Sequence, residues 1–218
     1  MITITLPDKS QREYESGITG MDIAQSISPR LAKEVLAISV NGETWDLSRS
    51  ITEDAEIKLF KWEDREGQET FWHSSAHMMA EAIEFFYPGT KFGIGPTIDT
   101  GFYYDIDLPE GKQLTEKDLE KIEAKIIELS RAKSDIIRST VSKADALKMF
   151  EEKGDVLKLE LISELEDGTI SLYNQGNFTD LCRGPHLPNT EYIKAVKLTS
   201  IAGAYWRGNE KNKMLTRV

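Results

Sequence analysis

Three histidines and one cysteine constrain how this chain can fold, because all four fall into two short segments with the same spacing. His73 and His77 are four residues apart in one segment, and Cys182 and His186 are four residues apart in the other, far along the chain. Side chains four residues apart on a helix share a face, so the first pair predicts a helix with both imidazoles on one side. If the two pairs form one site, the fold must bring a distant segment onto this helix.

Such a cluster suits two kinds of chemistry. Histidine and cysteine side chains can form a tetrahedral metal site. They can equally line a metal-free polar pocket that holds several proton carriers. One histidine on an apolar helix is as easily a satisfied core residue, but two pairs that use all the histidine and cysteine of the chain favour a shared site. The residues alone leave both chemistries open.

Composition limits the class of protein. A chain of 218 residues is long enough for two domains. Its formal net charge of -10, from 37 acidic and 27 basic residues, argues against broad non-specific binding of nucleic acid, although a local basic patch is compatible with it. A single cysteine excludes an intrachain disulfide and fits a reducing compartment. Because there is neither a signal-peptide pattern nor an apolar run long enough for a membrane span, we expect a cytoplasmic protein without a membrane partner.

The first sixty residues alternate short strands with one or two short helices. Asn41-Gly42 predicts a type I′ turn between strands at 37–40 and 43–47. The other expected elements are strands at 2–6, 12–14 and 55–60, a helix from Thr19 to Ile27, and a helical piece at 29–35. A sheet wrapped around a helix at this length is typical of a ubiquitin-like β-grasp domain. Nothing in it looks catalytic.

A charge-rich stretch at 61–67 is interpreted as a linker, and Thr70 as the N-cap of the helix that carries the first histidine pair. This helix is expected to end at Pro88-Gly89 and to bury an apolar stripe. The stripe consists of Met78, Met79, Ala82, Ile83 and Phe86. Glycines at 93, 95 and 101 among β-branched and aromatic residues indicate close backbone approach, and a substrate could lie there against the main chain.

Two further helices are expected at 115–133 and 142–154. Leu157, Leu159 and Leu161 then alternate with polar residues, which puts Lys158 on the opposite face, where it is either exposed or lines a pocket. Strands are expected at 169–174 and 195–198, a bent loop at 180–186, an aromatic turn at 203–208 and a strand-like end at 213–215. Because the chain stops right after that last element, we expect it to be part of a longer protein.

Five motifs together resemble one family. They are His73-Ser74-Ser75-Ala76-His77, Ile94-Gly95-Pro96, Gly101-Phe102-Tyr103-Tyr104-Asp105, Cys182-Arg183-Gly184-Pro185-His186 and the segment from Ala202 to Gly208. With them the chain resembles the N-terminal region of bacterial threonyl-tRNA synthetases. The resemblance implies an α+β fold, with a ubiquitin-like β-grasp (TGS) domain at 1–62 and a larger α+β editing domain of the threonyl/alanyl-tRNA synthetase type at 63–218. The aminoacylation and anticodon-binding domains of the family would lie downstream and are absent here.

The resemblance implies an editing activity, in which activated water hydrolyses the ester of mischarged Ser-tRNA(Thr). His73 would activate the water, Lys158 would stabilise charge on the ester, and His77, Cys182 and His186 would shape the pocket. The substrate-binding residues would be Asp180, Tyr104, Gly95, Pro96 and Arg183. Many threonyl enzymes have cysteine at the position of Ser75, so Ser75 is not expected to be a required nucleophile.

The resemblance also implies the ligands and partners. No metal or other cofactor is expected in this chain; if zinc is present, His73, His77, Cys182 and His186 would bind it, as in the alanyl relatives. ATP, Mg and zinc would serve the absent catalytic domain. The partners would be the acceptor end of tRNA(Thr) and serine or seryl-adenosine; the parent enzyme is expected to be a homodimer and this chain a monomer.

Two other functions stay open. One is a non-catalytic fragment that docks tRNA or binds zinc. The other is a free-standing editing protein of the alanyl type, against which the β-grasp region and Arg183-Gly184-Pro185 argue.

Overall fold

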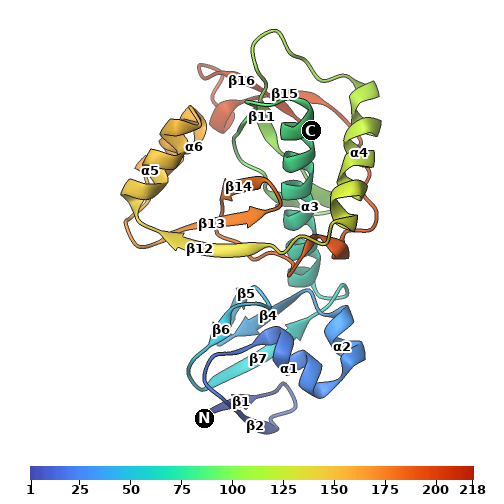
Figure 1. Cartoon of the computed structure of the whole chain (residues 1–218), viewed down its shortest axis with the longest axis vertical. Coiled ribbons are helices and arrows are strands. Elements are labelled where there is room, and N and C mark those ends of the chain that lie inside the picture. The colour runs from blue at the N-terminus through green and yellow to red at the C-terminus, as the bar shows by residue number, and fades with distance from the viewer. The chain divides into compact units, whose positions relative to one another are not determined.

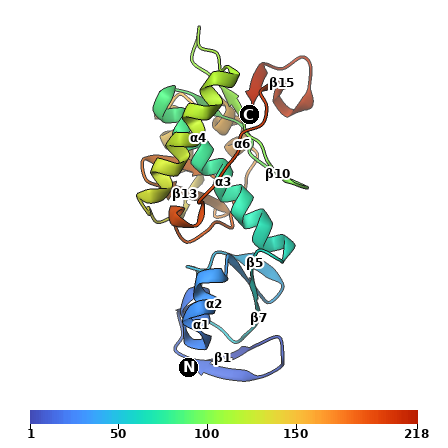
Figure 2. The same cartoon turned by 90° about the vertical axis from the view of Figure 1, so that its right-hand side faces the viewer.

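The structure is a computed structural model that describes all residues from Met1 to Val218. Its contacts divide the chain into two compact units, one of residues 1–74 with 184–188 and one of residues 75–183 with 189–218. The division falls inside a helix rather than in a linker. Both units mix helices and sheets, which confirms the predicted α+β fold (Figures 1 and 2). No helix combines the length and the apolar character needed to cross a membrane.

The first unit contains the predicted β-grasp fold. Its five-stranded sheet has the order β2-β1-β7-β4-β5, in which β1 and β7 are parallel and the other neighbours are antiparallel. The strands are β1 (Ile2–Thr5), β2 (Gln11–Tyr14), β4 (Ala37–Val40), β5 (Glu43–Trp45) and β7 (Ala55–Phe60). The helices are α1 (Gly20–Ile27) and α2 (Pro29–Glu34), and β3 (Ile18–Thr19) pairs with β6 (Ser50–Ile51).

Local sequence explains these elements. Thr19 and Asp22 form a capping box at the start of α1. Asn41 and Gly42 have φ values of 50° and 89°, which the type I′ turn requires, so the predicted hairpin is confirmed. Apolar side chains from the sheet and from α1 and α2 then form one core, which includes Ile4, Ile23, Val35, Ile38 and Leu47.

Helix α3 (Arg65–Phe86) leads into the second unit and lies beside α4 (Glu116–Arg131), as Figures 1 and 2 show. The remaining helices are α5 (Lys143–Glu152), α6 (Val156–Ser163) and the short 3-10 turns η1 (Thr190–Tyr192) and η2 (Trp206–Gly208). One four-stranded sheet has the order β15-β16-β11-β8, and a three-stranded sheet has the order β12-β13-β14. These strands are β8 (Lys91–Phe92), β11 (Asp105–Asp107), β12 (Ile137–Val141), β13 (Ile170–Gln175), β14 (Phe178–Leu181), β15 (Ala202–Tyr205) and β16 (Met214–Arg217), and β9 (Thr97–Ile98) pairs with β10 (Gly101–Phe102).

The predicted helices at 115–133 and 142–154 are confirmed. The backbone N–H of Thr115 donates to the Asp118 carboxylate at 2.9 Å at the start of α4, and Ser142 caps α5. The buried stripe of α3 is also confirmed at Met78, Met79, Ala82 and Ile83, but Phe86 is 41% exposed because the helix ends there.

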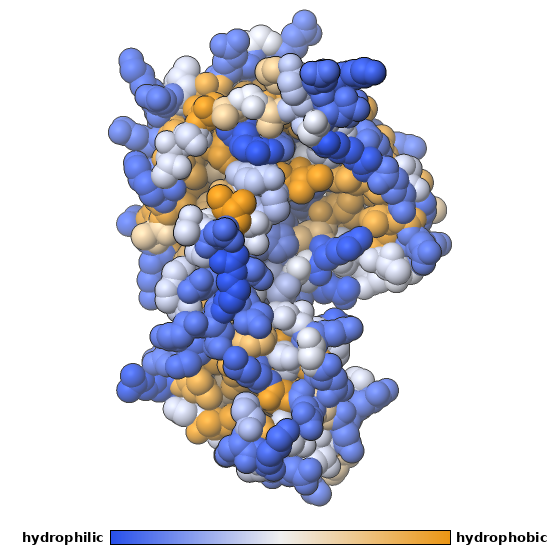
Figure 3. All heavy atoms as spheres, turned by 180° about the vertical axis from the view of Figure 1, so that it is seen from behind, coloured by the Kyte–Doolittle hydropathy of each residue, from blue (hydrophilic) through white to orange (hydrophobic).

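Polar side chains cover much of the face seen in Figure 3, with apolar patches between them.

Several local predictions are wrong. Thr70 is not an N-cap, because α3 already begins at Arg65; its hydroxyl instead donates to the carbonyl of Glu66 within the helix. The last residues of the expected linker, 65–67, are therefore helical. Residues 195–198 form no strand, whereas the expected aromatic turn begins with strand β15. Asp180 lies in strand β14 and not in the loop that follows it.

The alternation of leucines around Lys158 is also misleading. Residues 156–163 form helix α6, whose N-cap is Asp155, and not an extended segment. Leu157, Lys158 and Ile162 are all buried in it. The helix has one buried side, with Leu157, Lys158 and Ile162, and one exposed side, with Val156, Glu160 and Ser163. Because the buried side contains a lysine and the exposed side a valine, hydropathy does not show the helical period.

Candidate functional site

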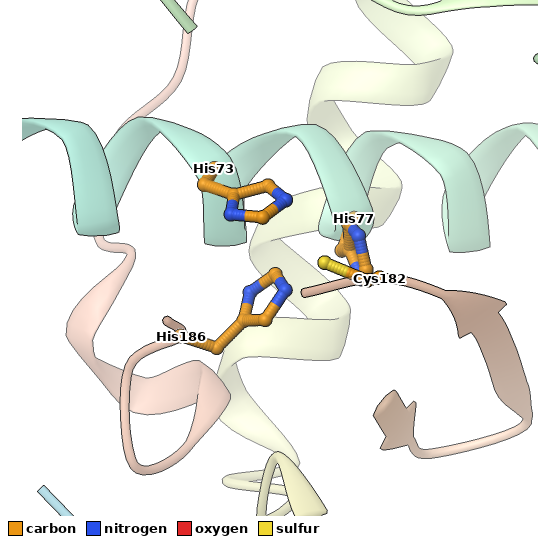
Figure 4. Close-up of side chains that lie close together, drawn as sticks. All are labelled: His73, His77, Cys182 and His186. Carbon is orange, nitrogen blue, oxygen red and sulfur yellow. The ribbon is translucent and has the colours of Figure 1, made fainter. Parts of the chain in front are cut away.

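Helix α3 presents the first histidine pair on one face, as its spacing predicts. In Figure 4, His73 and His77 project from the helix toward Cys182, at the end of β14, and His186, in the following loop. One potential ligand atom from each of the four side chains lies within 4.8 Å of the others. The rings of His73 and His186 are 4.2 Å apart between centroids. His77 and His186 are buried, whereas His73 and Cys182 keep partial exposure. The structure thus brings the two sequence pairs together.

A buried glutamate ties the β13–β14 hairpin to α3. Glu81 lies one helical turn beyond His77, and its carboxylate accepts hydrogen bonds from the Gln175 side chain at 3.1 Å and the Asn177 backbone at 3.2 Å. Burial raises the pKa of Glu81, against the smaller opposing effect of these hydrogen bonds. Because the hairpin leads directly into Asp180 and Cys182, this contact fixes where both side chains enter the site.

Lys158 is inside the site, so the interpretation of it as an exposed lysine is wrong. Its side chain is 3% exposed, and its ammonium lies 2.7 Å from Asp180 Oδ1, 3.1 Å from the carbonyl of Gly93 and 3.4 Å from the Tyr104 hydroxyl. An ammonium group has three N–H donors, and these three acceptors can engage all of them. Asp155 places the residue, since its carboxylate accepts the backbone N–H of Lys158 at 3.1 Å at the start of α6.

Asp180 is the centre of this buried network. Its Oδ1 also accepts its neighbour's N–H, from Leu181, at 2.8 Å, and its Oδ2 accepts the hydroxyl proton of Tyr104 and lies 3.9 Å from His77 Nε2. Burial acts to raise the pKa of Asp180, but Lys158 and His77 outweigh it and hold the pKa below its usual value. Burial and the neighbouring Asp180 carboxylate raise the pKa of Tyr104 well above its usual value, so Tyr104 stays a hydrogen-bond donor.

The glycine-rich segment approaches side chains of the chain itself. A Cβ on Gly95 would lie 2.6 Å from the ring of Tyr104, and one on Gly93 would lie 2.8 Å from the ring of Trp206. Pro96 continues this loop, and its carbonyl accepts the backbone N–H of Tyr103 at 3.3 Å. The close approach that the glycines indicate is therefore present, with aromatic rings in the positions where a substrate was expected.

Arg183 is exposed and, together with Cys182, lines a pocket of about 380 Å³. The rest of the lining comes from α6, β13, β14 and the segment between α6 and β13, and includes Leu161, Leu165, Ile170 and Leu181. Arg183 therefore lines a cavity that Cys182, one of the four clustered residues, lines as well.

Sequence reasoning missed two supporting residues, Ser74 and Asp155. Ser74 lies between the two histidines in sequence, and its hydroxyl contacts the Nδ1 atom of His186 at 3.0 Å. A serine within a helix gives no signal of such a contact. Asp155 could have been found as an N-cap three residues before Lys158, after Gly154, but the alternating leucines pointed to an extended segment.

Two protein-family models match parts of the chain. The TGS domain family matches residues 2–61, and the threonyl and alanyl tRNA synthetase second additional domain matches residues 170–218, which include Asp180, Cys182 and His186. The chain therefore contains a TGS domain and the second additional domain of these synthetases.

The chain is similar over its full length to part of the bacterial threonine--tRNA ligases. It is 65% identical to the ligase of Porphyromonas gingivalis over 218 residues, which are 33% of that protein. It is 64% identical to the ligase of Parabacteroides distasonis, again over 33% of its length, and 60% identical to that of Cytophaga hutchinsonii, over 34%. The chain thus spans about a third of the length of the relatives that it matches.

Proposed function

We propose that this chain hydrolyses the ester bond of mischarged Ser-tRNA(Thr), with water activated at the cluster of His73, His77, Cys182 and His186. The observation that carries the proposal is the convergence of these four side chains next to a buried lysine–aspartate pair. The similarity to threonine--tRNA ligases supplies the class of substrate. Aminoacylation with ATP and Mg²⁺, and assembly into a dimer, we assign to the part of those relatives outside these residues.

His73 is our choice for the group that takes a proton from water. It is the only partly exposed histidine of the three, so water reaches its ring, whereas His77 and His186 are buried. Imidazole titrates near neutral pH and therefore exchanges a proton readily under physiological conditions. In this proposal His77, Cys182 and His186 shape the pocket around the attacked ester.

Lys158 would stabilise the negative charge that develops on the ester oxygen. Its three N–H donors already have acceptors, so a substrate oxygen must replace one of them. We infer that it replaces the Tyr104 hydroxyl, because that contact is the longest at 3.4 Å. Tyr104 and Asp180 would then be close enough to contact the seryl group, and Gly95, Pro96 and Arg183 would contact the adenosine end.

The reaction must distinguish serine from threonine by one methyl group. In binding alone this difference contributes about 1–3 kcal/mol, so a second pocket that excludes the larger amino acid is needed for high fidelity. The buried Tyr104 ring, which packs against Gly95, is the wall that in this proposal excludes the threonyl methyl group.

The four side chains, three imidazoles and one thiol, are of the types that bind zinc. Zinc at about 2.0–2.3 Å from nitrogen and sulfur requires ligand atoms about 3.3–3.8 Å apart, and the four atoms here lie within 4.8 Å of one another, so small side-chain rotations would suffice. Bound zinc would act as a Lewis acid toward the ester. We nevertheless propose a metal-free pocket, because the buried Lys158 already supplies a positive charge next to the cluster.

The test is the release of amino acid from Ser-tRNA(Thr), Thr-tRNA(Thr) and Ala-charged tRNA, each measured with and without a chelator. The proposal is supported if serine is released equally with and without the chelator and Thr-tRNA(Thr) is not hydrolysed. Release that is lost with chelator and restored by zinc assigns the cluster to a metal. Preferred release of alanine indicates an alanyl-type editor. No release at high protein concentration indicates a fragment that only docks tRNA or binds zinc.

A further inference from the structure

The β-grasp fold contributes a buried carboxylate to the segment that carries His186. Asp46 directly follows β5, the edge strand of the five-stranded sheet. Its Oδ1 accepts the backbone N–H of His186 at 2.6 Å. Residues 184–188 accordingly belong, by their contacts, to the same compact unit as residues 1–74. A domain whose sequence shows no catalytic feature therefore contacts one of the four clustered residues.

Asp46 has little freedom to move. Its own carbonyl accepts the backbone N–H of Arg49 at 3.1 Å, which closes a tight turn. Before it, the ring of Trp45 is covered by the Arg49 guanidinium at 3.6 Å, and after it, Leu47 is fully buried and its carbonyl accepts the N–H of Met21 at 3.0 Å. The carboxylate is thus held from both sides by the core of the β-grasp fold.

Ser74 holds His186 at a second point. Its hydroxyl donates to the carbonyl of Thr70 at 2.9 Å and accepts the backbone N–H of Leu187 at 2.9 Å. The same hydroxyl also contacts His186 Nδ1 at 3.0 Å, so Ser74 touches both the ring of His186 and the backbone that follows it. Asp46 fixes the backbone of His186, and Ser74 fixes its ring.

We propose that Asp46 is a positioning residue for His186, and that the β-grasp domain is therefore required for the full hydrolytic rate of the site. This inference rests on the proposed function. A buried carboxylate is costly unless it is hydrogen-bonded, and here its hydrogen-bond donor is the residue that must be held in place. The ring of His186 then keeps its place in the cluster only when Asp46 holds the backbone in position.

The test compares Asp46→Ala, Asp46→Asn and a control, Asp54→Ala. The Asp54 carboxylate also accepts a backbone N–H in the β-grasp domain, that of Thr3 at 2.7 Å, but it is exposed and makes no contact with His186. Three quantities are measured in the full chain: kcat and KM for release of serine from Ser-tRNA(Thr), and the hydrogen-exchange rate of the His186 backbone amide.

We expect Asp46→Ala to lower kcat by about 10-fold to 100-fold with little change in KM, since a small misplacement of a reacting group has effects of this size. The His186 amide should exchange faster in the same variant. Asp46→Asn keeps an acceptor oxygen and should restore most of the rate, and Asp54→Ala should match the wild-type chain in both measurements. If Asp46→Ala is unfolded at the assay temperature, Asp46→Glu replaces it, because its longer side chain displaces the acceptor and keeps the charge.

The proposal is overturned if Asp46→Ala keeps the wild-type kcat and the wild-type exchange of the His186 amide. It is equally overturned if Asp54→Ala lowers kcat as much as Asp46→Ala, or if Asp46→Asn is as impaired as Asp46→Ala. If the wild-type chain releases no serine, the proposed function fails by itself. The exchange of the His186 amide then still decides whether Asp46 holds this residue.

Discussion

At the scale of single residues, the buried pair of Lys158 and Asp180 governs the chemistry of the site. Each ion has its charge compensated by the other at 2.7 Å, and both side chains are almost entirely shielded from water. Removing one partner of such a pair leaves an uncompensated buried charge, whereas removing both does not. Stability and hydrolysis can therefore be separated by substitution.

Lys158→Met should destabilise the chain by about 3–5 kcal/mol, because the Asp180 carboxylate stays buried without its cation. It should also slow serine release by about 100-fold or more, through the loss of the group that faces the developing charge. The double variant Lys158→Met with Asp180→Asn should recover much of the stability but not the hydrolysis. Chemical denaturation and a deacylation assay measure the two effects, with the exposed Lys148→Gln as control. Wild-type hydrolysis by Lys158→Met would contradict the role of this residue.

Glu81 gives a prediction about pH. Because its folded pKa is raised, the folded chain holds a proton that the unfolded chain releases, so its stabilising contribution is complete below the unfolded pKa of about 4.3 and is lost as pH rises through the folded value. Glu81→Gln stays neutral and keeps an acceptor oxygen. The free energy of unfolding of Glu81→Gln should thus increase relative to that of wild type between pH 4 and pH 7, which means that the variant gains relative stability. Urea denaturation at both pH values checks this, and a difference that does not change with pH would refute it.

At the scale of elements, the turn of the β13–β14 hairpin requires a glycine at position 176. Gly176 has a φ of 49°, and a Cβ there would lie 2.4 Å from Glu81 Oε1. The Glu81 carboxylate has no easy way to move aside, since it already accepts hydrogen bonds from both flanking residues of the turn. The turn therefore depends on the helix that it contacts.

Gly176→Ala should destabilise the chain more than Gly168→Ala, which is its matched control. Gly168 also has a positive φ, 84°, but open space surrounds its Cβ position. The control should lose about 1–2 kcal/mol from backbone strain alone. Gly176→Ala should lose at least about 1 kcal/mol more, because the Glu81 hydrogen bonds are disturbed as well. Thermal unfolding of both variants provides the comparison, and equal losses would argue against the helix contact.

Helices and hairpins with strong end signals were predictable from sequence. Thr115 with Asp118, Ser142, and Asn41-Gly42 each satisfy backbone groups locally, so the surroundings hardly affect the outcome. The true start of α3 and the helical state of α6 were not predictable in this way. Thr70 has the residue type of an N-cap but lies inside the helix. In α6 the buried side contains Lys158 and the exposed side contains Val156, so hydropathy does not show the helical period.

For the site, the sequence predicted the four clustered residues because they are the only histidines and cysteine of the chain. The leucine alternation also singled out Lys158, with an exposed position as the alternative, and the family resemblance assigned roles to Lys158, Tyr104 and Asp180. The contacts of Ser74, Asp155 and Asp46 join residues far apart in sequence or are hidden inside ordinary helix chemistry. Such contacts depend on tertiary packing, which local patterns do not encode.

At the scale of the whole molecule, the net charge of -10 limits how many phosphates of a tRNA the chain can contact. Extensive phosphate contact would require many cationic side chains, and affinity would then fall by about 10³–10⁵ between 50 mM and 200 mM salt. For the function that we propose, an acidic chain is better suited to recognising the esterified end of the tRNA alone.

A seryl-charged minihelix of the acceptor stem should therefore be hydrolysed with a KM close to that of full-length Ser-tRNA(Thr). The KM for either substrate should also rise much less with salt than the range given above, because few phosphates are contacted. Steady-state kinetics at two salt concentrations provide the measurement. A far lower KM for the full tRNA would instead indicate a broad contact surface.

The hydrogen bond from His186 to Asp46 has a consequence for recombination between related genes. Exchanging residues 1–62 with those of a homologue would replace more than an N-terminal module, because the acceptor for the backbone of a distant histidine would be replaced at the same time. A chimaera would then keep its hydrolytic rate only if the incoming module offers an acceptor at the position of Asp46. Residues 1–62 and the segment around His186 would therefore have to be exchanged together, although most of the chain lies between them.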